Sequence, residues 1–203
     1  MADLGLDASP TPIEVVDDTS GFELGITSER AALVEDADHL TATYSAAALG
    51  IVAALTPTDI FTIYGSATKT IKILRIGVSG TENTAAIRDI VLIKRSATNT
   101  GGTSSAVTKV PLDSNDAAAT ATVLSYSANP TALGAAVGNI RVAKLDIPAT
   151  NLTGTADRIE WTFGDRPGKS IVLRSASEGV AVNLNGVTAS TNSFNIDVEW
   201  TEE

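Results

Sequence analysis

Short apolar runs recur from Leu40 to the end of the chain, and the turns between them are rich in glycine, proline, asparagine and aspartate. Every second residue is apolar in two runs of the last quarter: Ile159, Trp161, Phe163, and Phe194, Ile196, Val198, Trp200. Because successive side chains of a strand point to opposite faces, both runs predict antiparallel strands with one buried and one wet face. Similar patterns predict strands at residues 60–64, 71–79, 87–94, 107–112, 120–127, 140–147, 170–174 and 179–184.

The apolar run Ala46–Leu55 is ambiguous between helix and strand. Its alanines and leucines favour a helix. Gly50 and the β-branched pair Ile51–Val52 favour a strand that contains a bulge. Pro57 ends the run in either case.

Two predicted strands carry apolar residues on both faces. In residues 71–79 the apolar set changes face at Leu74, which indicates either a bulge or burial on both sides. Residues 87–94 have Ile87, Val91 and Ile93 on one face and Ile90 and Leu92 on the other, and predict a central strand. Pro111 makes residues 107–112 an edge strand, because proline cannot donate to a ladder.

Polar segments connect these strands. Residues 96–106 form a glycine, serine and threonine loop that is long for a compact domain, so we expect it to be mobile or part of an interface. Asn185–Gly186 is a strong turn signal, although residues 187–192 indicate a connection longer than a two-residue hairpin.

Residues 1–40 differ from the rest of the chain. Pro10 and Pro12 interrupt any regular pairing, and acidic residues cluster at 17–18 and 35–38. Ser28 could cap a short helix over residues 28–40. We favour an arm, extended or partly helical, that lies across a partner or across its own sheet; a solvated acidic segment is the alternative.

The pattern as a whole contains some eight to ten short strands and at most one short helix. It predicts an all-β fold: an antiparallel β-sandwich of jelly-roll type, or a related barrel. The expected organisation is an N-terminal arm over residues 1–40 and a single sandwich domain over residues 41–203.

Composition narrows the function classes. The 203-residue chain has a net charge of −10, which argues against nucleic acid and against an anionic membrane as partners. It contains no cysteine, so neither disulfides nor thiolate metal sites are expected, which is compatible with a reducing cytoplasm. The N-terminus lacks the pattern of a signal peptide, and the longest apolar run is too short for a membrane span.

The polar residues do not combine into a recognisable catalytic site. His39 is the only histidine, so a surface or packing role is expected. Calcium could use the oxygen atoms of two acidic groups, but neither has the spacing of a calcium loop: Glu35, Asp36, Asp38, and Asp113, Asp116.

The polar residues of the last quarter of the chain do not form a recognisable catalytic site either. Residues 164–168 predict a turn with Asp165 and Arg166 in an ion pair, since no helix N-terminus follows to form a phosphate loop. Asp165 with Glu160 or Asp157 is a poor glycosidase pair. The acceptor pattern at residues 151–153 has no meaning without secretion. We therefore expect no enzyme, and no catalytic, cofactor-binding or metal-binding residues.

Trp161 and Trp200 lie on the apolar faces of their predicted strands. Both are expected in the core, with Phe163 beside them. Trp200, close to the end of the chain, could instead face a neighbouring subunit.

Two groups of segments, taken in order, resemble a family of uncharacterised proteins that recurs in tailed bacteriophages and prophages and is regarded as virion structural. The first group is Asp59–Thr70, Ile76–Thr81 and Val91–Ser96. The second is Asp113–Thr122, Tyr126–Thr131, Phe163–Gly168, Asn183–Gly186 and Ile196–Trp200. The resemblance covers about residues 40–203.

The resemblance implies a structural protein of the phage particle, assembled in the host bacterial cytoplasm. The leading expectation is a capsid decoration or cement protein that forms a homotrimer, binds the major capsid protein and stabilises the head shell. A tail, baseplate or fibre component, including a host-attachment module, is the alternative. A carbohydrate-binding jelly roll is the third reading.

Overall fold

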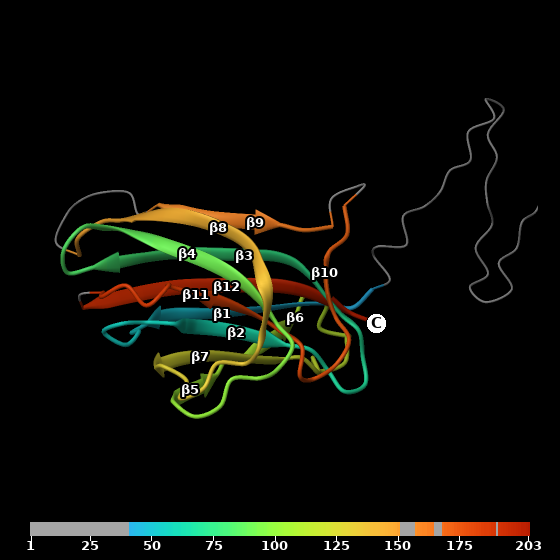
Figure 1. Cartoon of the computed structure of the whole chain (residues 1–203). Coiled ribbons are helices and arrows are strands. Elements are labelled where there is room, and N and C mark those ends of the chain that lie inside the picture. The colour runs from blue at the N-terminus through green and yellow to red at the C-terminus, as the bar shows by residue number, and fades with distance from the viewer. Residues whose placement is uncertain (1–40, 151–156, 165–167, 190) are drawn as a thin grey trace, which may run out of the picture. The chain divides into compact units, whose positions relative to one another are not determined.

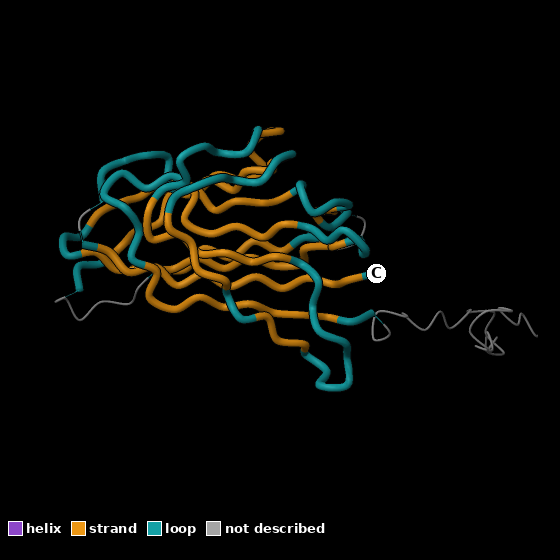
Figure 2. The backbone as a smooth tube through the Cα atoms, turned by 90° about the horizontal axis from the view of Figure 1, so that it is seen from below, coloured by secondary structure: helices purple, strands orange, loops and turns teal. Residues whose placement is uncertain are grey.

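The computed structural model describes residues 41–150, 157–164, 168–189 and 191–203, and all regular structure in these ranges is β-strand (Figures 1 and 2). The strands are β1 (Thr43–Ile51), β2 (Asp59–Tyr64), β3 (Ile71–Glu82), β4 (Ala86–Arg95), β5 (Thr103–Ala106), β6 (Lys109–Pro111), β7 (Thr122–Ala128), β8 (Ala136–Ile147), β9 (Arg158–Thr162), β10 (Ile171–Leu173), β11 (Gly179–Asn183) and β12 (Asn192–Glu202). No described helix has the length and hydropathy needed to cross a bilayer.

The strands form two antiparallel sheets that face each other. We call the first the β12 sheet; its order is β10-β3-β12-β1-β6, and β9 also pairs with β3. We call the second the β11 sheet; its order is β5-β7-β2-β11-β4-β8. The predicted all-β class and the two-sheet sandwich are therefore confirmed.

The core lies between the sheets and is built from the alternating apolar rows. Trp200 and Tyr44, from the β12 sheet, stack with ring centroids 5.8 Å apart and are fully buried. Phe61 and Leu92 face them from the β11 sheet. Trp200 is thus a core residue and does not face a neighbouring subunit, whereas Trp161 is half-buried at the margin of the core.

Each of the two ambiguous stretches, in residues 46–55 and in residues 71–79, contains a strand with a bulge. In β1 the register with β12 shifts between Ala48 and Ile51, where Gly50 has a φ of +70° that glycine tolerates best. In β3, Leu74 is the extra residue, because Arg75 pairs with Glu199 while Ile73 pairs with Trp200. This bulge turns the apolar residues on both sides of Leu74 towards the core.

Three expectations need correction. The described residues hold 12 strands, more than predicted: β5 falls within the expected loop of residues 96–106, and β1 covers the start of the run that is ambiguous between helix and strand. β4 is central in its sheet, but Ile87 on its outer face is 65% exposed, so it is not buried on both sides. Residues 96–106 are not a free loop: the last four are β5, which pairs with β7.

Candidate functional site

The structure does not assemble the polar residues considered from sequence into a site. His39, the acids at 35–38, residues 151–153 and the pair Asp165–Arg166 lie outside the described residues. Within the described ranges, no three histidine, cysteine, aspartate or glutamate side chains are placed to hold a metal ion.

The remaining acidic candidates have local structural roles. Asp113 accepts hydrogen bonds from the backbone N–H groups of Asn115 and Asp116, through Oδ1 at 2.9 Å and through its carbonyl at 3.0 Å. These contacts form the predicted turn. Asp157 accepts from the N–H of Arg158 at 2.9 Å.

Glu160 belongs to a ladder of charges on the outer face of the β12 sheet, formed by Arg75, Arg158, Glu160, Asp197 and Glu199. Glu160 Oε2 lies 2.9 Å from Arg75 Nη1 and 3.2 Å from Arg158 Nη2. Arg75 also pairs with Glu199, and Arg158 with Asp197. The hydrogen bond from Arg75, followed by that from Arg158, holds the pKa of Glu160 below its usual range. An acid ionised in this way is unsuited to donate a proton near neutral pH.

A buried polar group, the Asp59 cluster, lies on the outer side of the β11 sheet; it comprises Asp59, Arg95, Asn99, Gly134 and Asn183. Asp59, which is fully buried, accepts from Arg95 Nε at 2.6 Å and from Arg95 Nη2 at 2.7 Å. Asn99 and Asn183 donate to the same carboxylate at 2.8 and 2.7 Å. Both backbone polar groups of Gly134 make hydrogen bonds: its carbonyl accepts one from Arg95 Nη1, and its N–H donates one to Asn99 Oδ1.

Sequence reasoning missed this cluster. The signal in the sequence is a charged or amide residue at one end of each of three strands: Asp59 begins β2, Arg95 ends β4 and Asn183 ends β11. Because its four hydrogen bonds use both oxygens of the Asp59 carboxylate, the cluster is a structural lock. It fastens residues 96–102 and 129–135 over the sheet.

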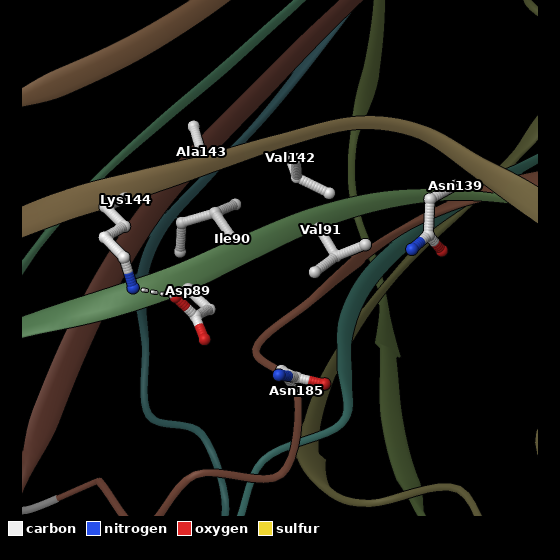
Figure 3. A pocket seen from close by; sticks show the side chains of 8 residues that line it. All are labelled: Asp89, Ile90, Val91, Asn139, Val142, Ala143, Lys144 and Asn185. Carbon is white, nitrogen blue, oxygen red and sulfur yellow. Dashed lines mark hydrogen bonds and ion pairs between the residues drawn. The ribbon is translucent and has the colours of Figure 1, made fainter.

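A shallow hollow of 410 Å³ lies on the outer face of β4 and β8, beside the turn that follows β11 (Figure 3). Val91 and Val142 line it, Asn139 and Asn185 face it from two sides, and Lys144 contacts Asp89 at one end at 2.6 Å. The hydrogen bond from Lys144 lowers the pKa of Asp89. The hollow thus offers an ion pair and amides over an aliphatic floor.

Three exposed apolar side chains lie close together in sequence, in and just after β1, and two of them, Leu49 and Leu55, are the most exposed large apolar residues of the described chain. Leu49, Val52 and Leu55 are 89%, 58% and 68% exposed. No charged residue occurs from Thr41 to Thr58. We call residues 47–55 the β1–β2 apolar segment; it lies at the end of the sandwich away from the C-terminal label in Figure 1. Exposed apolar groups of this density mark interaction sites more often than chance.

The sheet edge is also open here. β6 pairs only with Tyr44, Ser45 and Ala46, so the rest of β1 has no described strand on that side. Leu112 N–H donates to Thr43 O, and backbone groups of a strand alternate in direction, so those of Ala47 point to the open side. Lysine and proline, which commonly protect edges, are absent from this part of β1.

The apolar segment is held firmly although its side chains are exposed. Gly50 N–H donates to Asn195 Oδ1 at 2.9 Å, and Ala53 N–H donates to Asn192 Oδ1 at 2.8 Å. Further along, Leu55 O accepts from the backbone N–H of Ala189 at 2.7 Å. A partner would therefore meet a preorganised surface, which lowers the entropic cost of binding.

No family model, no curated protein and no solved structure matches this chain.

Proposed function

We propose that this chain is a structural protein of a tailed-phage particle: a decoration protein that binds the head shell through the β1–β2 apolar segment. The observation that carries the proposal is the exposure of Leu49, Val52 and Leu55 on a rigid, uncharged and open sheet edge. Such a surface is suited to burial against another protein, and its edge could accept an additional strand.

The strand order supports the jelly-roll type of sandwich. One sheet contains β1-β12-β3-β9 and the other β2-β11-β4-β8 as consecutive neighbours. This is the order in which an eight-stranded jelly roll distributes its strands, with β5, β6, β7 and β10 as additions. Jelly rolls are a common architecture of viral capsid and lectin domains, so the fold is compatible with the proposal without deciding it.

The apolar side chains are sufficient to hold one protein on another when many copies bind. Burying a fully exposed valine or leucine contributes about 1.5–3 kcal/mol. Leu49 is nearly fully exposed and should give close to this whole amount. Association entropy offsets part of the gain, so we expect moderate affinity for each copy.

Co-sedimentation with empty head shells of the major capsid protein encoded by the same genome tests the proposal. We expect the full chain to pellet with shells and to raise their melting temperature. Leu49→Asp should weaken binding at least tenfold, because an aspartate buried without a partner costs more than the leucine contributes. Ile87→Asp, a matched change on the outer face of the β11 sheet, should leave shell binding intact.

Failure of the unmodified chain to pellet would overturn the proposal, as would equal loss of binding in both variants. Immunogold labelling of whole particles separates the alternatives, because label confined to the tail would favour a tail or fibre component.

A further inference from the structure

β8 forms one edge of the β11 sheet and is as long as any described strand. It pairs with β4 on one side, and no described strand pairs with its other side, where Arg141 packs over the ring of Phe163 just after β9. Val137 and Val142 are 65% and 67% exposed along it. This edge is separate from the β1–β2 apolar segment, which lies in the other sheet and its connection to β2.

The regular part of β8 is its second half. Val137 and Ile140 are extra residues in the ladder with β4, so both sit at bulges. From Arg141 to Ile147 the pairing with β4 is continuous. Bulges disfavour further pairing where they occur, so a new strand would be added along residues 141–147.

The outward-facing side chains of this half are Val142, Lys144 and Asp146, two residues apart, while Leu145 and Ile147 face the core. The row thus holds one apolar, one basic and one acidic side chain. In an antiparallel pair about a two-fold axis at Leu145, Lys144 of one copy would lie opposite Asp146 of the other, twice. Opposite charges directly across a ladder stabilise the pairing of the two strands.

The net charge of the sandwich domain is small enough for two copies to approach each other. Residues 1–40 contain 10 acidic residues and 1 basic residue, while residues 41–203 contain 14 acidic and 13 basic residues. The net charge of −10 therefore divides into −9 and −1. The sandwich is almost neutral, so repulsion between two of them is weak.

We propose that a second copy of this chain docks on β8 by antiparallel pairing of the two β8 strands about a two-fold axis. A row that carries both charge signs two positions apart is complementary to itself. A strongly acidic or strongly basic partner would meet a like charge at one of the two positions. The contact is isologous and closes at two copies. It does not depend on the proposed shell binding.

Sedimentation velocity on the full chain over a range of concentrations tests this arrangement. We expect a reversible shift from the 20.8 kDa monomer to a dimer of twice that mass. Val142→Asp should raise the dissociation constant about tenfold, since it removes an apolar contact and places an aspartate diagonally across from Asp146 of the other copy, twice. Asp146→Lys should also weaken the dimer, and Lys144→Asp with Asp146→Lys should restore it, because the exchange recreates the opposed charges.

The matched control is Leu49→Asp, which should leave the dimer unchanged. A monomer at all concentrations, a trimer, or a dimer that tolerates both Val142→Asp and Asp146→Lys would overturn the proposal. Shell binding lost only in Leu49→Asp and dimerisation lost only in the β8 variants would show that the two surfaces act separately.

Discussion

Replacing Asp59 with asparagine tests whether the Asp59 cluster stabilises the sandwich through its charge. The two side chains have nearly the same shape, so the change leaves no cavity. Asparagine keeps one acceptor oxygen and replaces the other by an N–H₂ group. That group would face donors, because Arg95, Asn99 and Asn183 all donate to the carboxylate.

The expected cost follows from burial. Asp59 is fully buried and the Arg95 side chain nearly so, which means that the guanidinium loses its counter-charge without gaining water. Removing one partner of a buried ion pair costs roughly 3–5 kcal/mol. Since native domains are stable by about 5–15 kcal/mol, a large share of the total would be lost. For a domain of this size the melting temperature should fall by roughly 6–20 °C.

Urea unfolding followed by tryptophan fluorescence, together with calorimetry, measures this loss. Asp113→Asn is the control, because an asparagine at that exposed turn still accepts the same hydrogen bonds; its effect should stay within about 0.5 kcal/mol. A cost below about 1 kcal/mol for Asp59→Asn would refute the view that ionic contacts fix the cluster.

Further changes give distinct outcomes. Burial would raise the pKa of Glu202, but hydrogen bonds outweigh it and the pKa is lowered, so its stabilisation is present above about pH 4.5 and lost as pH falls through the lowered pKa. Glu202→Gln should therefore cost about 1–3 kcal/mol at pH 7, with the difference from the unmodified chain shrinking in acid unfolding curves. Gly134→Ala would place its Cβ 1.8 Å from the carbonyl oxygen of Ala97, so calorimetry should show a loss of about 1–3 kcal/mol or more. Trp200→Ala should cost about 3–5 kcal/mol in urea unfolding and Trp161→Ala clearly less, because only Trp200 is fully buried; equal costs would contradict the assigned core.

The fold could be anticipated wherever alternation and turn chemistry agree. Phe194 to Trp200 alternate in sequence and form the central strand of their sheet. Asn185 and Gly186 both have positive φ, at 59° and 67°, as the turn signal implied. Gly50 indicated the bulge in β1, the strand that takes up the run from Ala46 as far as Ile51.

Pairing between distant strands could not be anticipated. Whether Ile87 or Ile90 is buried depends on which face of β4 meets the other sheet, and alternation alone cannot decide this when both faces are apolar. Asp59 could not be singled out, because Arg95 and Asn183, two of its partners, are 36 and 124 positions away. The exposure of Leu49 was hidden too, because it depends on which face of β1 meets the other sheet.

The Asp59 cluster also affects how the β11 sheet resists unfolding. Its members come from β2, β4, β11 and two loops, so it is complete only when these three strands and both loops have come together. Contacts formed late in folding act mainly by slowing unfolding. Residues 96–102 should therefore resist a protease and exchange their amide hydrogens slowly for as long as the sheet survives, and become accessible only when the sheet unfolds as a unit.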